Sequence, residues 1–403
     1  MAELMEARIG EDSVLKQILS KTREKPKLLF VSPTLPSLTG HGTAMRAGVM
    51  LEVLSNYFNV VLVVVHLYRR RRHEPDIASL RLWCEECILF TPNDREEKML
   101  QAVQDVLARH SFDVLHIFRL ALIMGATPVI RLMWPACPVR ILDLDDFESK
   151  SHRRLAALYE LNSDRKSAAA HEQAATHFAS VEEQMLPQFD EILVCNEIDQ
   201  TELANLYPST RFRVTPNAIR SPGTVVRKAA SDVFQLLFVG TMDYFPNEDA
   251  VTFFCREILP IVRRRSLIPV HIQIVGSRPT RKVLAFGKQP GVEVTGEVID
   301  VSPNYQNADA VIVPVRAGGG TRIKILEAWA YGCPVVSTFL GAEGLSATHD
   351  FDLLIADDPG HFADCCLWLA DSTERASRLA ENGRSTVEQK YSLKNVAAGM
   401  GLA

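Results

Sequence analysis

The residues best suited to chemistry lie in one short stretch, RAGGGTRIKILEAWAYGCPVVST, between residues 316 and 338. Three consecutive glycines, Gly318 to Gly320, come before a helix-forming segment and carry no side chain that would keep a ligand from the backbone. Amides at a helix N-terminus are unpaired and attract anions. Arg322 and Lys324 add full positive charges, and an arginine can hold a phosphate through two parallel hydrogen bonds. These residues predict a phosphate-binding loop.

The helix that follows the glycines has recognisable ends. We expect Thr321 to be its N-cap and Tyr331 its last residue, because Gly332 permits a left-handed stop and Pro334 prevents continuation. Thr321 and Glu327 share one face of this helix, roughly 9 Å apart along the axis at about 1.5 Å per residue. A carboxylate at that distance is placed to accept hydrogen bonds from the vicinal hydroxyls of a ribose.

A simpler interpretation is a surface helix with an Arg–Glu or Lys–Glu pair, behind a glycine loop that binds nothing. Other nucleotide motifs are poor alternatives. The stretch lacks the Gly-Lys-Ser/Thr ending of a Walker loop, and the motif set of a protein kinase is missing. The segment SLTGHGTAMRAG, residues 37–48, has Gly40 and Gly42 but lacks the third glycine of the dinucleotide fingerprint.

The composition is that of a globular protein without general affinity for nucleic acid. The 403 residues are 47% hydrophobic and 23% charged, with a formal net charge of −5. The acidic N-terminus lacks a signal-peptide apolar stretch, and the longest apolar run, residues 60–65, is too short for a membrane span. Cys84 and Cys87 form a lone CEEC, which favours reduced thiols over a zinc site. We therefore expect a cytoplasmic protein.

Short apolar runs alternate with longer amphipathic segments along the chain. Such runs are typical of strands in a parallel sheet covered by helices on both faces. They predict an α/β fold with two Rossmann-like, doubly wound domains that face each other across a cleft. The runs are KLLFVSP (27–33), NVVLVVV (59–65), DVLHIF (113–118), RILDLDD (140–146), EILVCN (191–196), FRVTPN (212–217), QLLFVG (235–240), HIQIVG (271–276), VEVTG (292–296), AVIVPV (310–315) and PVVST (334–338).

The domain boundaries follow from a turn-rich segment with little periodicity, AIRSPGTVVRKAASD, which we interpret as the linker. Ligands of doubly wound sheets bind beyond the carboxyl ends of the strands, so the loops there should hold the chemistry. The predicted parts are a lead-in helix over 1–26, an N-terminal domain over 27–218, the linker over 219–231, a C-terminal domain over 232–390 and a tail or helix over 391–403.

Several motifs carry a resemblance to a known family. The segments FVGTMDYFPNEDA (238–250), IQIVGSRP (272–279) and the run from VTGEVID to GAEG (294–344) resemble glycosyltransferase family 4. Its members depend on nucleotide sugars and have the two-Rossmann GT-B architecture. The chain is most similar to the bacterial group with a GGGTR-K-LEA donor loop. The resemblance spans about 27–390 and is strongest over 235–345.

The resemblance implies retaining, metal-independent transfer of a sugar, with no cofactor, from a UDP- or GDP-sugar. The acceptor would be a hydroxyl of a glycan, a lipid-linked molecule or a small molecule, bound by the N-terminal domain. The C-terminal domain would bind the donor, with the base recognised largely by backbone near Val298. The implied donor-binding residues are Gly240, Thr241, Gly276, Val298, Gly318, Gly319, Gly320, Thr321 and Glu327.

The chain departs from the family pattern at charged positions. Glu327 matches the second of two family glutamates, which contacts the ribose, but the first, which contacts the donor sugar, falls on Gly319. The family's arginine and lysine after the first strand of the C-terminal domain are also missing, and Asn247 stands near the lysine position. Arg322 and Lys324 are the available replacements, and we predict that they stabilise the diphosphate during catalysis.

The N-terminal half offers weaker candidates. Gly40, His41 and Gly42 are similar to the family's first glycine-rich loop, which faces the diphosphate and the acceptor. His41 there either donates to a phosphate or is simply solvated. In the segment RILDLDDFES, Asp145 and Asp146 follow Asp143 at a strand end. We predict that they orient sugar hydroxyls in catalysis, with helix capping as an equal alternative.

Two further residues lie at or near another strand end. Arg119 follows the run that contains His116, and we interpret His116 as a hydrogen-bonded core histidine.

Two other functions remain open. A degenerate, non-catalytic chain that binds a nucleotide sugar or regulates another transferase would explain the missing glutamate and cations. A sugar-nucleotide epimerase would need further acid and base residues, which the sequence does not place.

The basic run Arg69–Arg72 predicts a peripheral contact with anionic lipid on the inner face of a membrane. The alternatives are a solvated loop and a contact with a phosphate-bearing acceptor. We expect vesicles rich in anionic lipid to sediment the protein, and a variant with Arg69 to Arg72 changed to glutamine to stay in the supernatant. Neutral vesicles are the control, and equal recovery with both kinds of vesicle would contradict the prediction.

Overall fold

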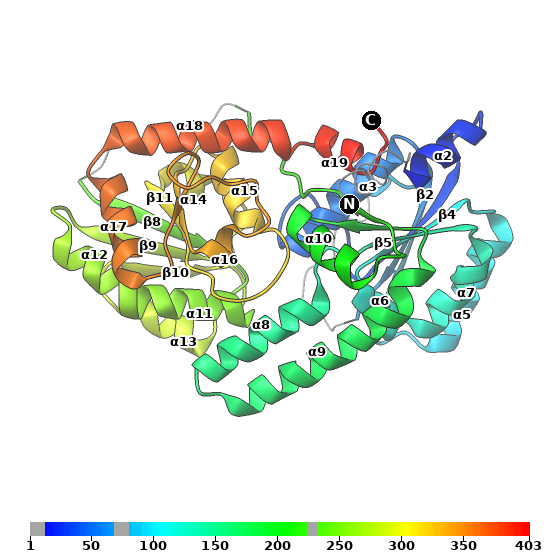
Figure 1. The fold of residues 1–403 in the computed structure, drawn as a ribbon, viewed down its shortest axis with the longest axis horizontal. Coiled ribbons are helices and arrows are strands. Elements are labelled where there is room, and N and C mark those ends of the chain that lie inside the picture. Colours follow the sequence, from blue (N-terminus) through cyan, green and yellow to red (C-terminus); the bar gives the residue numbers. More distant parts are fainter. Residues whose placement is uncertain (1–12, 68–79, 224–231) are drawn as a thin grey trace. The chain divides into compact units, whose positions relative to one another are not determined.

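The computed structural model describes residues 13–67, 80–223 and 232–403. The chain divides into two compact units. The first unit comprises residues 1–149, 174–217 and 393–403, and the second comprises 150–173 and 218–392. The basic run Arg69–Arg72 and most of the predicted linker, residues 224–231, lie outside the described residues. Each unit is built on its own parallel sheet (Figure 1).

The first unit contains a seven-stranded sheet in the order β3-β2-β1-β4-β5-β6-β7, in which all neighbouring pairs are parallel. Its strands are β1 (Lys27–Ser32), β2 (Asn59–Val65), β3 (Glu86–Phe90), β4 (Val114–Phe118), β5 (Val139–Asp143), β6 (Glu191–Val194) and β7 (Phe212–Val214). Its helices are α2 (Val14–Lys21), α3 (Gly42–Ser55), α5 (Glu96–Arg109), α6 (Leu120–Gly125), α7 (Thr127–Met133), α10 (Glu197–Leu206) and α19 (Leu393–Gly399), with short 3-10 turns η1 (Trp134–Ala136) and η2 (Leu186–Gln188).

The second unit contains a six-stranded sheet in the order β10-β9-β8-β11-β12-β13, again with parallel pairs. Its strands are β8 (Phe234–Val239), β9 (Val270–Val275), β10 (Val292–Gly296), β11 (Ala310–Val313), β12 (Val335–Ser337) and β13 (Leu354–Ile355). Its helices are α11 (Phe245–Phe253), the π-helical η3 (Phe254–Ile258), α12 (Leu259–Arg265), α13 (Arg281–Phe286), α14 (Ser302–Asn307), α15 (Ile323–Ala330), α16 (Phe339–Ala342), α17 (Pro359–Ala370) and α18 (Thr373–Lys390).

Two long helices contain positions where the chain changes from one unit to the other. They are α8 (Glu148–Leu161) and α9 (Arg165–Met185), and residues 150–173 of this pair group with the second unit. The sequence predicts residues 150–173 in the N-terminal domain and a tail or helix over 391–403. The C-terminal segment contains helix α19, which groups with the first unit, where Gly399 approaches the backbone of Val214 so closely that a side chain would not fit.

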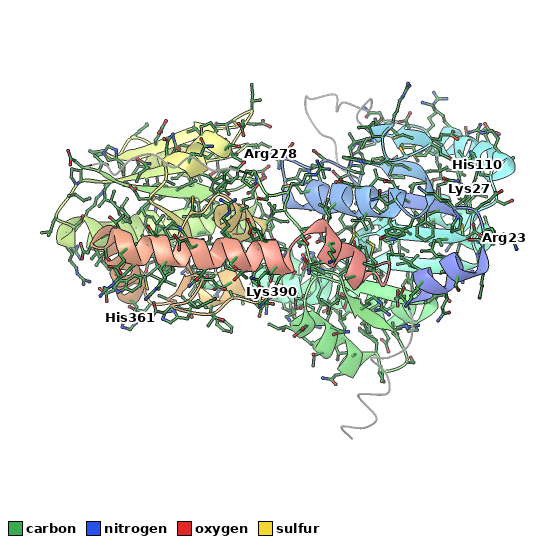
Figure 2. The ribbon with its side chains drawn as sticks, turned by 90° about the horizontal axis from the view of Figure 1, so that it is seen from above. Arg23, Lys27, His110, Arg278, His361 and Lys390 are labelled. Carbon is green, nitrogen blue, oxygen red and sulfur yellow. The ribbon has the colours of Figure 1, made fainter. Side chains whose placement is uncertain are left out.

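The predicted apolar runs all coincide with strands, and the α/β fold with two parallel sheets is confirmed. The sequence analysis missed two edge strands, β3 and β13. Most of β3 is only half-buried and β13 has two residues, so neither shows the continuous apolar run of a central strand. Figure 2 shows the side chains of both units. Lys27 at the start of β1 lies beside His110 at the end of α5, and the distance from Lys27 Nζ to His110 Nδ1 is 2.9 Å.

Both sheets reverse their strand order once. In the first unit β1 lies between β2 and β4, and in the second unit β8 lies between β9 and β11. The chain therefore leaves in opposite directions after two adjacent strands, and such a switch point opens a crevice beyond their carboxyl ends. In the second unit, the loops at this crevice follow β8 and β11, and the second of them contains the three glycines.

Helix α15, which follows the glycines, is fixed by the burial of Trp329. This side chain is fully buried, and its Nε1 donates to the Asp352 carbonyl at 2.9 Å. Helix α18 packs against α15, and a Cβ placed on Gly383 would lie 2.3 Å from the Trp329 ring. The close approach of the two helices thus depends on the missing side chain at Gly383. Figure 1 shows α18 on one side of the sheet, with α11 and α12 on the other.

The search for membrane-spanning helices gave no candidate within the described residues, where every helix is too short or too polar.

We expect a Gly383→Ala variant to be destabilised by about 1–3 kcal/mol, because overpacking against Trp329 outweighs the better helix propensity of alanine. The free energy of unfolding from urea denaturation measures this. Ser377→Ala at an exposed position of α18 is the control and should be neutral or slightly stabilising. A Gly383→Ala protein as stable as the control would contradict the packing account.

Candidate functional site

The glycine loop lies at the switch point of the second unit, directly after β11. Gly318 and Gly320 have φ angles of +102° and +67°, which residues with a side chain rarely adopt. A Cβ on Gly318 would also lie 3.0 Å from the Tyr244 hydroxyl oxygen. Both conditions explain why glycine stands at these positions.

The helix after the loop starts later than the sequence predicts. Helix α15 begins at Ile323, and Arg322 occupies the N-cap with φ −81° and ψ 92°. Thr321 was predicted as the N-cap, and this is wrong: its hydroxyl is buried and finds no hydrogen-bond partner among the described residues. The left-handed turn at Gly320 displaces Thr321 from the capping position. The C-terminal end agrees with the prediction within one residue, with Gly332 at φ +63°.

The loop turns its carbonyl groups toward Arg322. The guanidinium donates to the carbonyl oxygens of Gly319 and, at 3.3 Å, of Ala317. The C=O of one residue and the N–H of the next point in opposite directions across a planar trans peptide bond. The amides of Gly318 and Gly320 therefore point away from Arg322. Among the described residues, no acceptor is recorded for any backbone amide from Gly318 to Thr321.

Lys324 reaches the loop after β8. Its Nζ lies 2.7 Å from Oδ1 of Asn247 and 4.3 Å from the centre of the Phe238 ring. The ammonium group thus lies beside Asn247, the residue that stands near the family's lysine position. Burial, with a smaller effect of the neighbouring Arg322 charge, lowers the pKa of Lys324 to about 7.

Glu327 lies on the same helix and accepts a hydrogen bond from the Tyr305 hydroxyl at 2.9 Å. The Tyr305 ring is fully buried and stacks on Tyr331, with ring centres 5.1 Å apart and an angle of 3° between the planes. Burial raises the pKa of Glu327 to about 7, and the Tyr305 hydrogen bond and the Lys324 charge oppose this rise. Glu327 is therefore a half-buried residue that is hydrogen-bonded to Tyr305, and not half of a simple Lys–Glu pair.

The other predicted donor-binding residues lie in neighbouring loops of the second unit. Gly240 follows β8, and a Cβ there would lie 3.1 Å from Lys324 Nζ. Gly276 follows β9, where a Cβ would lie 1.7 Å from the Gly240 carbonyl oxygen, so this position requires glycine. The Thr241 carbonyl accepts a hydrogen bond from Asn247 Nδ2 at 2.9 Å. Val298 lies farther along, after β10, and packs against the core of the unit.

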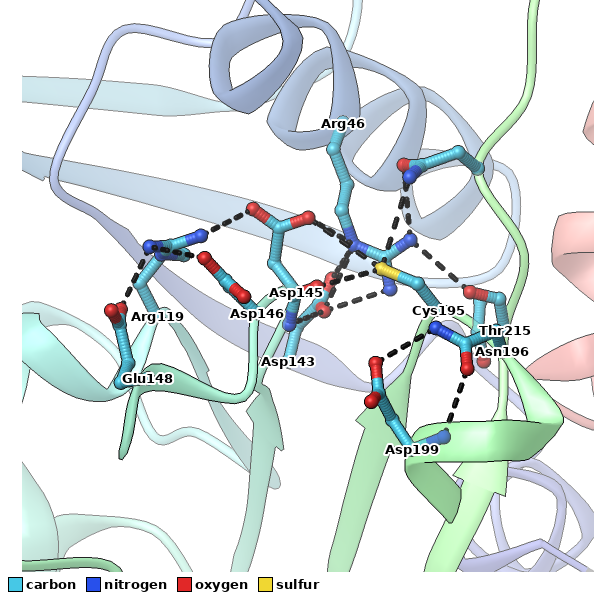
Figure 3. A network of polar contacts seen from close by, with 11 residues as sticks. Arg46, Arg119, Asp143, Asp145, Asp146, Glu148, Cys195, Asn196, Asp199 and Thr215 are labelled. Carbon is cyan, nitrogen blue, oxygen red and sulfur yellow. Dashed lines mark hydrogen bonds and ion pairs between the residues drawn. The ribbon is translucent and has the colours of Figure 1, made fainter. Parts of the chain in front are cut away.

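The first unit contains a buried polar network at the carboxyl end of β5 (Figure 3). Arg46 of α3 is buried and binds Asp143, with its Nη2 2.8 Å from Oδ1. Its Nη1 donates to the Thr215 carbonyl and to Asn217 Oδ1, both at 3.1 Å. Burial raises the pKa of Asp143 to about 6, and the Arg46 charge opposes this rise. The network ties α3 to β5 and to the segment after β7.

Asp145 and Asp146 are held by a second arginine, Arg119, which follows β4. Arg119 donates to Asp145 Oδ2 at 2.8 Å and to Glu148 Oε1 at 2.7 Å, and Asp146 Oδ2 lies 3.8 Å from its Nη2. Burial raises the pKa of Glu148 to about 7, and the Arg119 charge opposes this rise. Arg119 and Asp145 both have positive φ angles, 74° and 56°. The two aspartates are thus ion-paired groups at the start of α8.

Sequence reasoning missed Arg46 and Glu148. A charged residue amid the apolar positions of the segment GTAMRAGVML, close after a glycine loop, is the signal that could have revealed Arg46. Glu148 lies in the segment RILDLDDFES, and nothing in the sequence links it to Arg119.

The remaining candidates of the first unit have local structural roles. His41 caps α3, and its Nδ1 accepts the Ala44 amide at 3.3 Å, so its Nε2 carries the hydrogen. Gly42 is the first residue of α3, and Gly40 has φ +100°. His116 is buried in β4, as predicted, but neither ring nitrogen has a partner among the described residues, so the expected hydrogen bond is absent. Burial lowers the pKa of His116 to about 3.

The described cysteines are all free thiols. Within the same residues, the structure brings together no group of three or more His, Cys, Asp or Glu side chains placed to hold a metal ion.

The chain is similar to known glycosyltransferases. Residues 233–372 match the family model of Glycosyl transferases group 1. An uncharacterised 44.6 kDa protein in the cps region of Klebsiella pneumoniae is 24% identical over 171 residues, which are 40% of this chain and 43% of that protein. The alignment therefore spans less than half of that relative's length.

Solved structures match nearly the whole chain. Sucrose-phosphate synthase from Thermosynechococcus elongatus aligns with a TM-score of 0.69 and 14% identity over 93% of this chain and 97% of its own. HepE from Anabaena, in complex with UDP and glucose, aligns with a TM-score of 0.65 and 12% identity over the same shares. At these identities the likeness establishes the fold.

Together the two parallel sheets and these matches define a protein of the GT-B fold. Residues 233–372 of the second unit match the group 1 glycosyl transferase model, which agrees with the resemblance seen in the sequence.

The lowered pKa of Lys324, about 7, has a measurable consequence. A bound diphosphate would favour the charged ammonium, so binding above pH 7 must take up a proton. We expect the affinity for UDP to fall as the pH rises from 7.5 to 9, by up to about tenfold per unit for one linked proton. Titration calorimetry in two buffers of different ionisation enthalpy measures the proton uptake. Lys324→Gln is the control and should lose most of it, and equal uptake in both proteins would contradict the assignment.

Proposed function

We propose that this protein is a retaining glycosyltransferase that moves a sugar from a UDP- or GDP-sugar to an acceptor hydroxyl. The single observation that carries the proposal is the set of unpaired amides from Gly318 to Thr321 at the switch point, with Lys324 and Glu327 behind them on α15. Positively polarised N–H groups with a nearby cation suit a pyrophosphate. A carboxylate farther along the helix suits the ribose hydroxyls.

In this proposal, the site acts by stabilising charge that develops on the leaving group. Breaking the bond between the sugar and the diphosphate leaves additional negative charge on the phosphate oxygens. The loop amides and Lys324 would stabilise that charge as it forms, because they are held in place before the reaction. Arg322 would add its positive charge to the site while its guanidinium keeps holding the loop carbonyls.

The acceptor chemistry follows from retention at the sugar carbon. In the scheme that the family resemblance implies, the leaving phosphate takes the proton of the acceptor hydroxyl on the same face, and no protein nucleophile is needed. We assign Asp145 and Asp146 the role of orienting sugar hydroxyls. Both are held by Arg119, and each has carboxylate oxygens that can accept hydrogen bonds. The acceptor would be a glycan, a lipid-linked molecule or a small molecule.

The relatives support the choice of donor. HepE was crystallised with UDP and glucose and also with UDP-glucose. We transfer this donor class to the present chain on the fold and on the loop geometry described above. The proposal includes neither a metal ion nor a cofactor. We also propose that the protein is cytoplasmic and contacts the inner face of a membrane through Arg69–Arg72.

A specific observation favours one other function. Gly319 stands where the family has the glutamate that contacts the donor sugar, so a chain that binds the nucleotide sugar without turning it over is the second candidate. Release of UDP or GDP from the donor in the presence of acceptors separates the two, since only the enzyme liberates it.

Binding of nucleoside diphosphates tests the donor site. We expect UDP or GDP to raise the melting temperature in a panel that also contains ADP and CMP. Glu327→Gln should weaken binding of the stabilising nucleotide by about 1–3 kcal/mol, because the ribose loses hydrogen bonds to a carboxylate.

Tyr305→Phe is the matched control for this test. It removes the hydrogen bond to Glu327 and leaves the carboxylate in place. It should retain more of the binding than Glu327→Gln does. If none of the nucleotides changes the melting temperature of the wild-type protein, the donor-site proposal fails.

A further inference from the structure

An arginine from outside the donor-site segment also contacts the glycine loop. Arg154 lies on α8, in the part of that helix that groups with the second unit. Its Nη1 donates to the Gly318 carbonyl oxygen at 3.3 Å. The same guanidinium forms a two-pronged ion pair with Glu343, at 2.5 Å and 2.8 Å. Arg154 thus links the glycine loop to the segment that follows α16.

This contact completes a pattern in the loop. The carbonyl oxygens of Ala317 and Gly319 accept from Arg322, and the one between them accepts from Arg154. Three successive carbonyl groups are therefore held by guanidinium N–H groups. Each carbonyl fixes the plane of its peptide bond, so each also fixes the direction of the next amide. Arg154 sets the direction of the Gly319 amide in this way.

The surroundings hold Arg154 against the loop. Leu155 and Leu158 of α8 pack with Ala317 and Phe245 in a small apolar cluster. The Tyr159 ring stacks on Phe245, with ring centres 3.8 Å apart and an angle of 5° between the planes.

A second polar link connects the end of α8 to Arg316, which precedes the glycines. Asn162 Nδ2 donates to Asp249 Oδ1 at 3.0 Å, and the same carboxylate forms a two-pronged ion pair with Arg316. Residues 150–162 therefore contact Gly318 directly through Arg154 and are linked to Arg316 through the Asp249 carboxylate.

We propose that Arg154 is a positioning residue for the donor site, which orients the Gly319 amide toward the pyrophosphate through its bond to the Gly318 carbonyl. This inference rests on the proposed function. Glu343 takes part by fixing the guanidinium in the plane that reaches the carbonyl, since a two-pronged pair restricts arginine geometry more than a single contact does. Lysine cannot bind both partners in this way.

A simpler role for Arg154 has to be separated from this one. Arg154 lowers the pKa of Glu343 and balances its negative charge, although burial opposes the shift. Removing the arginine alone would leave a carboxylate near the loop, and that charge would repel a pyrophosphate. A double variant that removes both charges distinguishes repulsion from loss of positioning.

The experiment measures the affinity for UDP and for inorganic pyrophosphate by titration calorimetry, together with the melting temperature of the ligand-free protein. The variants are Arg154→Gln, Arg154→Lys and the double variant Arg154→Gln with Glu343→Gln. Arg265→Gln is the matched control, because it breaks an Arg–Asp pair with Asp364 in the same unit and away from the loop. Arg154→Lys also serves if Arg154→Gln fails to fold.

We expect all three Arg154 variants to bind both probes about tenfold more weakly, a change of about 1.4 kcal/mol. The control should bind as the wild type does, and the double variant should stay weak. In turnover assays the loss should appear in KM for the donor sugar more than in kcat.

Three results would decide against the idea. Wild-type affinity in Arg154→Gln, or recovery of affinity in the double variant, overturns the positioning role while leaving the proposed function intact. A loss of affinity that only follows a lower melting temperature of the ligand-free protein overturns it as well. If the wild-type protein binds neither UDP nor pyrophosphate, the proposed function itself fails and the inference with it.

Discussion

The proposed donor site depends on the orientation of a few peptide planes in the loop between β11 and α15. Glycine can adopt the backbone angles found there. A glycine-rich loop can also adopt many other conformations, so ordering it costs a large conformational entropy. The guanidinium of Arg322 restricts this freedom by holding the carbonyls of Ala317 and Gly319. The amides are then directed without any side chain beside them. Through this constraint a flexible sequence becomes an ordered loop, which the proposed function uses to bind the pyrophosphate.

Burial of charge is the second feature of the molecule. In the second unit, Lys324 and Glu327 both have a pKa near 7, because each is half-buried and largely removed from solvent. In the first unit, Asp143 is also buried, but Arg46 binds it in a two-pronged pair. Buried charges are costly unless they are paired, so these groups are poor choices for stability alone. Lys324 and Glu327 lie on the helix after the loop at the switch point of the second sheet, and this is the physical reason to propose a binding role for them.

The sequence predicted the central strands well, because they depend on short-range patterns, and the binding role of the glycine loop stays a prediction. Continuous apolar runs identified β1 and β11, and the spacing of Gly318 to Glu327 gave the order of loop, cation and carboxylate. The predicted cap at Thr321 failed because the backbone turn at Gly320 is a property of the folded loop. The contacts of Arg46 and Arg154 were missed for a different reason. Their partners lie 97 and 189 residues away in sequence, and local pattern carries no information on such pairs.

The most direct test of the account observes the loop amides themselves. A protein labelled with nitrogen-15 at its 21 glycines gives separate amide resonances for this residue type in two-dimensional NMR. On addition of UDP, the account predicts large downfield shifts of the Gly318, Gly319 and Gly320 amide protons, as expected for N–H groups that donate to phosphate oxygens. If UDP binds while these three resonances stay in place and those of other glycines move, the pyrophosphate lies elsewhere and the account is wrong.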